Sequence, residues 1–253
     1  ATQIGLSKIL DTAEKLGIST LVREGRYNDE HAAMSIGGIY KGVKPIEMAS
    51  AYGAIGLNGR YVKASCIQKI VDRDGKIIYE NKPQLRSTVN AGAAYLTTNM
   101  LQDVLISGTA GGMGIGRPAA GKTGTTDSGI DAWFVGYTPE LSCAVWVGDD
   151  NNSPMNMYGS GAPLSIWHSF MIGALKNVPA SNFSNPGVTV PPEPQIKKEE
   201  LDKDGKPIKK DKDGKPIVST TPQKNKTSTK EKVKTAIGKL EKVVVGNKPS
   251  KQK

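Results

Sequence analysis

The sequence predicts an α+β domain, an antiparallel sheet flanked by helices, followed by a disordered tail. Two strand-like runs, residues 132–137 and 141–147, follow each other with only a short proline turn between them, as in an antiparallel pair. Helical patterns stand separately before and after these strands. The composition changes near residue 178, so we expect a domain over residues 1–178 and a tail over residues 179–253.

Two helices are predicted in the first part of the chain. Apolar residues at helical spacing over residues 4–16 indicate an amphipathic helix, and Gly17 is placed to end it. Pro45 suits the first turn of a second helix, where its missing N–H costs nothing. This second helix is expected to stop near Asn58-Gly59, a pair that favours a turn.

A hairpin and a third helix come next. Residues 64–71 and 76–79 are strand-like, and the Asp-Gly pair at 74–75 is a turn signal between them. Asn90 is a residue type that caps helices, and Gly108 closes the helix that it begins. The apolar face expected for this helix comprises Ala94, Met100, Leu101, Val104 and Leu105.

The final helix of the predicted domain spans residues 163–176. Its apolar side is expected to pack on the sheet and comprises Leu164, Trp167, Phe170, Met171 and Leu175. Three tryptophans, Trp133, Trp146 and Trp167, are therefore interpreted as core packing between the sheet and this helix rather than as a surface for stacking sugars.

The positive charge of the chain is concentrated in the tail. The formal net charge is +10, and residues 180–253 carry 18 lysines and nine acidic residues, which leaves residues 1–179 with a net charge of +1. A nearly neutral domain does not predict a basic groove for nucleic acid. We therefore expect no nucleic-acid partner.

The tail has the composition of a disordered segment. It is rich in Lys, Pro, Thr, Ser and Asn, and it has no aromatic residue after Phe183. Such a segment buries too little apolar area to offset its ordering entropy, about 1–2 kcal/mol per residue. Two interpretations stay open: a tail that is simply solvated, and a tail attracted to anionic wall polymers or lipid head groups.

Residues 116–123 match the phosphate-binding loop pattern G-x-x-x-x-G-K-[ST], which would indicate a nucleotide-binding protein. A phosphate loop must follow a buried strand and open a helix whose amides hold the phosphates. Here the residues before the match are rich in glycine, and the next regular pattern after it, residues 132–137, is a strand. The context therefore argues against nucleotide binding.

A second interpretation makes Lys122-Thr123-Gly124-Thr125 an edge strand that lines an acyl-transfer site. Lys122 would supply an ammonium, and Thr123 and Thr125 hydroxyl donors, for the carboxylate of a peptide substrate. Gly124 would let the substrate backbone approach as an added strand. The amide of Thr125 would then form half of an oxyanion hole. All four are predicted catalytic residues, and Lys122, Thr123 and Thr125 are also the predicted substrate-binding residues.

Three blocks in the same order resemble class A penicillin-binding proteins. Residues 42–52 resemble the segment before their sheet, residues 117–127 their active-site strand, and residues 131–140 with 144–148 their next two strands. The similarity extends over residues 1–178. The resemblance implies a fold like that of serine β-lactamases and penicillin-binding transpeptidases, incomplete in this chain.

The resemblance also implies an activity and partners. Members of this family cross-link peptidoglycan: a serine attacks the D-alanyl-D-alanine bond of a stem peptide, and the acyl group passes to an amine. The implied partners are the stem peptide of the lipid-linked precursor and β-lactam antibiotics. Class A members have a membrane helix and a glycosyltransferase domain before the transpeptidase. We therefore expect a protein at the extracellular face of the bacterial cytoplasmic membrane, anchored only through an N-terminal helix absent from this chain.

The chain departs from the family pattern in two motifs. It contains no Ser-x-Asn, and its sole Ser-x-x-Lys is Ser250 to Lys253, in the predicted tail. Because both motifs precede the first helix in the family, we expect this chain to be an inactive fragment that lacks the nucleophile. The alternative is a catalytically dead protein that binds the cell wall or acts as a scaffold.

The remaining reactive residue types suggest no second site. His31 and His168 are isolated from other metal-ligand residues, so surface or capping contacts are expected for them. Asp127, in an Asp-Ser-Gly run, is interpreted as a turn residue. Cys66 and Cys143 are expected to be buried free thiols. No metal and no cofactor are predicted.

Overall fold

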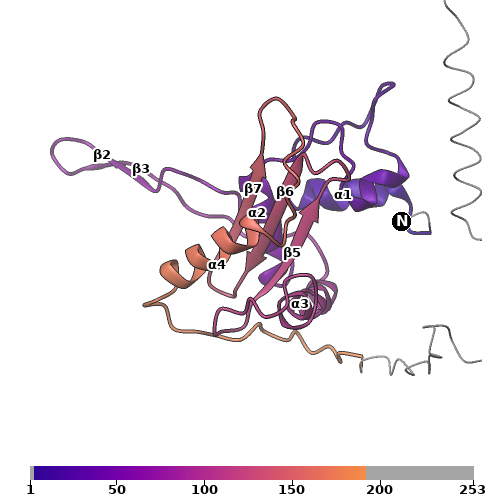
Figure 1. Ribbon diagram of the computed structural model, residues 1–253. Helices are drawn as coiled ribbons and strands as arrows, with labels where there is room; N and C mark the ends of the chain where they lie inside the picture. The colour runs from indigo at the N-terminus through magenta and orange to yellow at the C-terminus, as the bar shows by residue number, and fades with distance from the viewer. Residues whose placement is uncertain (1–2, 192–253) are drawn as a thin grey trace, which may run out of the picture. The chain divides into compact units, whose positions relative to one another are not determined.

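The computed structural model describes residues 3–191 (Figure 1). The predicted tail from residue 192 onwards lies outside the described residues. In chain order the elements are α1 (Leu6–Lys15), the 3-10 helix η1 (Ala32–Ile36), α2 (Pro45–Gly56), β1 (Arg60–Tyr61), β2 (Lys69–Val71), β3 (Ile77–Glu80), β4 (Arg86–Ser87), α3 (Ala91–Ile106), β5 (Ala120–Thr125), β6 (Asp131–Tyr137), β7 (Ser142–Gly148) and α4 (Ala162–Ala174).

The central sheet has three antiparallel strands in the order β5-β6-β7. Each strand follows the previous one in the sequence, so short connections suffice and the predicted antiparallel pairing is confirmed. The sheet lies between helices: α4 packs on β6 and β7 from one side, and α2 packs on the same strands from the other (Figure 1). The predicted α+β class is therefore confirmed.

The face of the sheet toward α4 carries the main core. Phe134 and Trp167 pack with ring centroids 4.9 Å apart and an angle of 58° between their ring planes, and both side chains are fully buried. Gly136 allows this contact, because a Cβ at this position would come within 2.6 Å of the Trp167 ring. Two residues of α4 expected in this core, Leu164 and Met171, are buried, but Phe170 is half exposed.

The opposite face is closed by α2 near one end of the sheet. Tyr137 meets Tyr52 of α2 at 6.2 Å between centroids, and its hydroxyl lies 3.0 Å from the hydroxyl of Thr98 in α3. Burial raises the pKa of Tyr137 well above its usual range, so this hydroxyl stays neutral and can donate. The packing of α3 is less regular than predicted, since Met100 is exposed.

Local signals correctly placed several element ends. Gly17 has φ 96° and ends α1, and Asn58 and Gly59 have φ 54° and 80° after α2. Asn90 caps α3 by accepting a hydrogen bond from the amide of Ala93 at 3.1 Å. Left-handed backbone favours Gly and Asn, which explains why these residues were informative. The short pair β1 and β4 and the helix η1 were not predicted.

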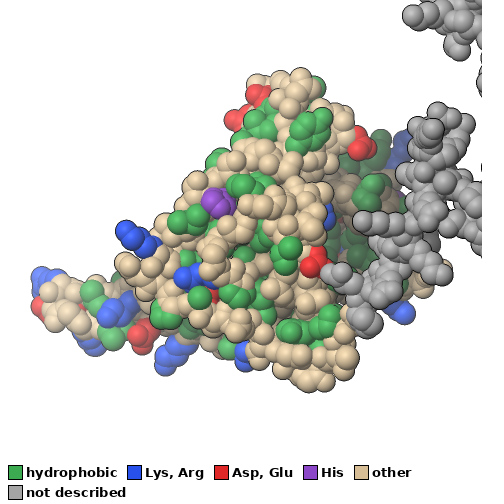
Figure 2. Space-filling view, turned by 60° about the horizontal axis from the view of Figure 1, so that its bottom comes forward, with side chains coloured by type: hydrophobic (Ala, Val, Ile, Leu, Met, Phe, Trp, Pro, Cys, Tyr) green, Lys and Arg blue, Asp and Glu red, His purple; other side chains and the backbone are tan. Residues whose placement is uncertain are grey.

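The predicted hairpin β2–β3 forms an arm that extends from the body (Figure 1). Its strands are shorter than expected, and every residue in them is exposed. Figure 2 shows Lys and Arg side chains along this arm with acidic side chains among them. Cys66, next to the arm, is also exposed, so its predicted burial is wrong, while the half-buried Cys143 lies in β7; both are free thiols.

Residues 179–191 contact the body. Phe183 packs edge-on against Tyr137 at 5.6 Å, and Glu140 accepts hydrogen bonds from the amide and hydroxyl of Ser181 at 2.8 and 2.5 Å. Arg117 donates to the carbonyl oxygen of Val178 at 2.7 Å, immediately before this segment. The packed body thus continues beyond residue 178. The division into a domain and a disordered tail stays a prediction, because residues 192–253 lie outside the described part.

Candidate functional site

Lys122 to Thr125 form the last four residues of β5. Within residues 3–191, β5 pairs only with β6, so it is an edge strand of the sheet, as predicted. Gly124 lies opposite Trp133 in the register. The roles predicted for these four residues, however, are not tested by their position alone.

The backbone N–H and C=O groups of β5 alternate between the neighbouring strand and the outer edge of the sheet. The amide of Thr126 donates to the carbonyl oxygen of Asp131 at 3.1 Å and continues the ladder between β5 and β6. Because hydrogen-bonded and non-hydrogen-bonded pairs alternate in antiparallel strands, Gly124 and Lys122 also bond to β6. The N–H and C=O groups of Thr123 and Thr125 therefore point outward, away from the sheet.

Lys122 is exposed and stays beside this outward edge. Its ammonium donates a hydrogen bond to the carbonyl oxygen of Thr123 at 2.9 Å. Among residues 3–191, no carboxylate forms an ion pair with Lys122. Its positive charge is consequently available to an anion placed along the strand edge.

The two threonine hydroxyls are held by loops on either side. The hydroxyl of Thr123 lies 2.9 Å from that of Thr109, in the segment after α3. The hydroxyl of Thr125 accepts a hydrogen bond from the amide of Gly159 at 3.0 Å, so the proton of this hydroxyl remains free to donate. Gly159 fits there because a Cβ would come within 2.5 Å of the Gly124 carbonyl oxygen.

A cleft of about 500 Å³ opens beside Gly124 to Thr126. One wall is the segment of residues 36–45, which precedes and begins α2. The other wall is the end of the sheet, where Asp131, Trp133 and Trp146 lie on the face opposite α4. The cleft therefore joins the candidate strand to a second chain segment almost 80 residues away in the sequence.

Polar contacts fix the wall formed by residues 36–45. The fully buried Asp29 accepts hydrogen bonds from the amide of Val22 at 2.6 Å and from that of Tyr40 at 2.7 Å. The hydroxyl of Thr20 donates to the carbonyl oxygen of Gly42 at 2.6 Å. A buried carboxylate satisfied by backbone amides fixes the loop, because releasing either partner would leave a buried charge unpaired.

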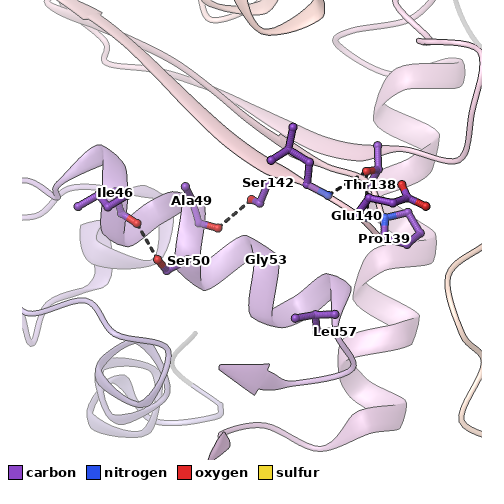
Figure 3. A pocket seen from close by; sticks show the side chains of 10 residues that line it. Ile46, Ala49, Ser50, Gly53, Leu57, Thr138, Pro139, Glu140 and Ser142 are labelled. Atoms are coloured by element: carbon purple, nitrogen blue, oxygen red, sulfur yellow. Dashed lines mark hydrogen bonds between the residues drawn. The ribbon is translucent and has the colours of Figure 1, made fainter. Parts of the chain in front are cut away.

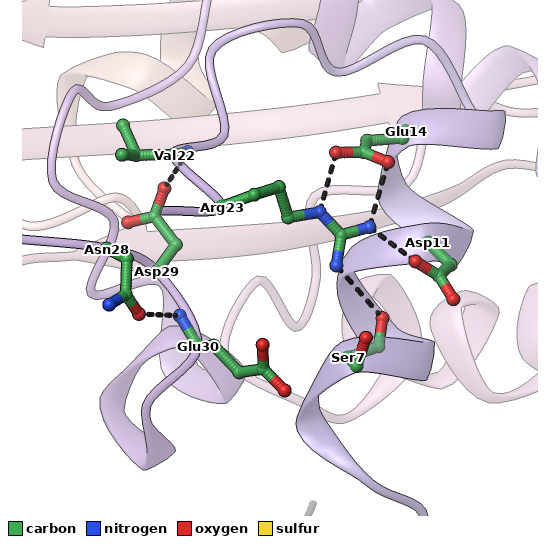
Figure 4. Close-up of polar contacts among 8 residues, drawn as sticks. All are labelled: Ser7, Asp11, Glu14, Val22, Arg23, Asn28, Asp29 and Glu30. Atoms are coloured by element: carbon green, nitrogen blue, oxygen red, sulfur yellow. Dashed lines mark hydrogen bonds and ion pairs between the residues drawn. The ribbon is translucent and has the colours of Figure 1, made fainter. Parts of the chain in front are cut away.

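Arg23 links the loop that carries Asp29 to α1 (Figure 4). Its guanidinium donates two hydrogen bonds to Glu14, both 2.8 Å long, and a further one to Asp11. The hydrogen bonds from Arg23 lower the pKa of the Glu14 carboxyl, and Glu14 in turn raises the pKa of Arg23. This bidentate arrangement orients the loop that carries Asp29.

A second cavity, of about 290 Å³, lies between α2 and the turn from β6 to β7 (Figure 3). The hydroxyl of Ser142 donates across it to the carbonyl oxygen of Ala49 at 2.8 Å, which fastens α2 to β7. Its one ionisable side chain is Glu140. Burial raises the pKa of this carboxyl, but hydrogen bonds, chiefly those from the amide and hydroxyl of Ser181, outweigh burial and lower it. The cavity lies at the far end of β6 from Asp131, and its polar groups serve packing.

The structure contradicts the phosphate-loop interpretation of residues 116–123. Lys122 and Thr123 lie inside a strand, and no helix begins within the residues that follow, since β6 is the next element. The amides needed to hold phosphates at a helix N-terminus are therefore missing from this place. The nucleotide-binding alternative is wrong for this segment.

The tryptophans do not all serve the core. Trp167 is buried as expected, but Trp146 is 40% exposed and Trp133 is half-buried, with their ring centroids 6.3 Å apart. The sequence predicted a substrate cleft beside the strand but did not place Trp133 and Trp146 in its lining. It also missed Thr109 and Gly159 as hydrogen-bond partners of the strand. The sequence did indicate a role for Gly159, because two glycines close together, at 159 and 161, mark a segment that another backbone can approach closely.

Comparisons with known proteins found relatives that match most of this chain. The sequence matches the family described as penicillin binding protein transpeptidase domain over residues 1–171. It is 36% identical over 195 residues to penicillin-binding protein 1A of Clostridium botulinum, covering 74% of this chain and 23% of that protein. It is 33% identical over 194 residues to penicillin-binding protein 1B of Escherichia coli, covering 73% of this chain and 22% of that protein.

Solved structures show the same relationship. PonA1 of Mycobacterium tuberculosis, in complex with penicillin V, is similar with a TM-score of 0.64 and 30% identity, covering 74% of this chain and 55% of that one. Penicillin-binding protein 1A of Haemophilus influenzae has a TM-score of 0.63 at 20% identity, which shows the fold alone. The chain spans less than a quarter of the length of the curated relatives named above. Within residues 3–191, no helix has the length and apolar character to cross a membrane.

Proposed function

The chain belongs to the penicillin-binding protein transpeptidase domain family, and we propose on that premise that its protein is a peptidoglycan D,D-transpeptidase. The observation that supports this most is the outer edge of β5. It combines a lysine ammonium that has no carboxylate partner among residues 3–191, a threonine hydroxyl free to donate, and outward backbone groups at Thr123 and Thr125, beside an open cleft.

The edge of β5 suits a peptide that ends in a carboxylate. The substrate lies along β5 as an added strand, and its backbone bonds the outward groups of Thr123 and Thr125. Lys122 and the threonine hydroxyls hold the terminal carboxylate through charge-assisted hydrogen bonds. The amide of Thr125 then donates to the carbonyl oxygen of the bond to be broken, as one half of an oxyanion hole.

The reaction divides into two acyl transfers. A serine oxygen attacks the carbonyl carbon between two D-alanines, the C–N bond breaks, and the terminal D-alanine leaves with a proton on its nitrogen. An amine of a neighbouring stem peptide then attacks the ester, the serine takes back its proton, and a cross-link forms. The described residues contribute binding and the oxyanion donor, and the serine belongs to polypeptide outside them.

The same wall is proposed to bind β-lactams. A penicillin carries a carboxylate and a strained amide in the relative positions of the donor peptide, so Lys122 and Thr125 would hold it in the same way. One similar structure, PonA1, is described in complex with penicillin V. We further propose that the protein acts at the outer face of the cytoplasmic membrane, where the stem peptides of lipid-linked precursors are found.

Labelling with a fluorescent penicillin tests the proposed function. The complete gene product should acquire one covalent label on a serine, located by peptide mapping, and should release D-alanine from a pentapeptide ending in D-Ala-D-Ala. The chain of residues 1–253 alone should acquire no label. A complete gene product that binds the pentapeptide but neither takes the label nor releases D-alanine would favour the catalytically dead scaffold instead.

A further inference from the structure

The positive charge within residues 1–179 is concentrated in the arm and its base. Residues 60–86 carry seven Lys and Arg residues and three acidic residues, which gives a net charge of +4. Because residues 1–179 have a net charge of +1, the rest of that range has a net charge of −3. Figure 2 shows basic side chains along the arm. The arm and its base therefore attract anions, whereas the surface around them does not.

The arm joins the body through two chain segments that separate from each other. Next to the body β1 pairs with β4, and farther out the amide of Asn81 donates to the carbonyl oxygen of Gln68 at 2.8 Å. Between these points one segment comprises residues 62–67 and the other residues 82–85, and no backbone hydrogen bond joins them. Segments of unequal length cannot stay in register, and Pro83 has no N–H to donate. The ladder is therefore open at the base of the arm.

A hollow of about 660 Å³ lies where the two segments separate, and we call it the base hollow. Lys63, Lys82 and Arg86 line it, and its lining contains no acidic residue. Within residues 3–191, none of these three cations forms an ion pair. Asn81 and Gln84 add side-chain amide donors to the lining. The base hollow thus gathers three positive charges without a carboxylate to neutralise them.

The guanidinium of Arg86 is held in place by Tyr61, the residue opposite it in the pairing of β1 with β4. Its central carbon lies 5.1 Å from the centroid of the Tyr61 ring, and Tyr61 is only 6% exposed. A cation–π contact uses the flat face of the guanidinium, and the N–H groups lie in its plane and can still donate. Such a planar fork matches two oxygens of one phosphate, whereas a lysine ammonium binds phosphate as a point charge.

We propose that the base hollow binds the phosphodiester groups of an anionic polymer made of repeating polyol phosphate units. Arg86 binds one phosphate through two N–H groups, and Lys63 and Lys82 pair with the phosphates of neighbouring units. A single phospholipid head group would leave two of the three cations without a partner, so a polymer fits this lining better. The inference goes beyond the proposed function, because the base hollow shares no lining residue with the cleft beside β5.

Calorimetric binding of poly(glycerol phosphate) to the complete gene product tests the proposal. The triple variant Lys63→Gln, Lys82→Gln and Arg86→Gln should raise the Kd about tenfold, because it removes the charged phosphate contacts. The double variant Lys63→Gln and Lys82→Gln keeps the contact between Arg86 and Tyr61 and should raise the Kd about threefold. Circular dichroism checks that both are folded. An unchanged Kd in the double variant would overturn the proposal even if the triple variant failed to fold.

A second triple variant, Lys69→Gln, Arg73→Gln and Lys76→Gln, is the matched control. These three residues are exposed on the same arm but do not line the base hollow, so the variant removes the same charge from the same element. It should raise the Kd less than about twofold, by weakening only the long-range attraction. The basic tail is identical in all variants and contributes equally. Equal losses in the two triple variants would show attraction by net charge alone and would overturn the proposal.

Two other ligands distinguish the phosphate polymer from other anions. Vesicles containing phosphatidylglycerol and poly-L-glutamate of matched charge should respond alike to the two triple variants, because neither ligand fits the base hollow specifically. If either of them lost affinity only in the variant of the base hollow, as the phosphate polymer does, the assignment to a phosphodiester polymer would be wrong. Failure of penicillin labelling would refute the proposed function without affecting these measurements, since binding at the base hollow requires no acylation.

Discussion

The two faces of the central sheet use tryptophan in opposite ways. Toward α4, Trp167 is fully buried against Phe134 in the core. Toward the cleft, Trp146 is 40% exposed and is held by Asp131 and Gly148 instead of by apolar neighbours. Residue type alone does not distinguish them. The difference lies in what surrounds each ring, a packed helix in one case and an open cleft in the other.

This comparison separates stability from binding within a single sheet. A fully buried aromatic side chain contributes to folding because its removal leaves a cavity. An indole held on an open face by one hydrogen bond contributes little to folding, but it offers a rigid apolar surface to a ligand. Substitutions on the two faces should therefore have effects of different kinds.

Truncating the buried tryptophan should give the largest effect. Trp167→Ala is expected to lower the free energy of unfolding by about 3–5 kcal/mol, because it leaves a cavity against Phe134. Trp146→Ala should lower it by less than about 1 kcal/mol, the range of an exposed contact. Urea denaturation followed by circular dichroism measures both. Equal losses for the two variants would show that the faces do not differ as described.

Filling the two glycine positions should give an intermediate effect. Gly136→Ala places a Cβ within 2.6 Å of the Trp167 ring and should cost about 1–3 kcal/mol of stability through overpacking. Gly124→Ala, whose Cβ would lie 3.2 Å from Cβ of Trp133 at the open cleft, should cost less. Thermal unfolding compares the two, and a lower melting temperature for Gly124→Ala than for Gly136→Ala would contradict the comparison.

The smallest expected effect is a pH dependence of stability that arises beside the cleft wall of residues 36–45, opposite the tryptophans. Burial raises the pKa of Glu47, but hydrogen bonds from the amide and hydroxyl of Ser19 and from Lys44 outweigh burial, so the pKa is lowered. A lowered folded-state pKa gives stability that is fully present above the ordinary glutamate pKa, about 4.3, and is lost as the pH falls through the lowered value.

Glu47→Gln should therefore destabilise the chain at neutral pH by less than Gly136→Ala does. The difference from the wild type should shrink below about pH 4. Denaturation at a series of pH values checks this. A difference that stays constant down to strongly acidic pH would show that the carboxylate charge of Glu47 plays no part in holding residues 36–45.

Sequence reasoning predicted the parts of the fold that depend on local chemistry. Pro45, Asn90 and the glycine at 17 mark element ends because few other residues suit those backbone positions. The strand over Lys122 to Thr125 was predictable because its neighbours exclude a helix. Pairing between β1 and β4 was not predictable, since two-residue strands carry no periodicity.

The walls of the cleft could not be predicted, because they depend on contacts between distant segments. Asp29 lies in a loop, and nothing in its surroundings along the chain indicates that it binds the amide of Tyr40. Asp131 and Trp146 become neighbours only through the register of β6 and β7. Helical periodicity also assigned too many residues to the core, since Met100 and Phe170 fit an apolar helix face but are exposed.

The central claim is that Lys122 forms part of an acyl-transfer site, and the acylation rate of the complete gene product by a fluorescent penicillin tests it most directly. Lys122→Ala should slow acylation by roughly ten- to hundredfold, the loss of one charge-assisted hydrogen bond, with an unchanged circular dichroism spectrum. Lys176→Ala, at an exposed lysine beyond α4, should leave the rate unchanged. An unchanged acylation rate in Lys122→Ala would contradict the account.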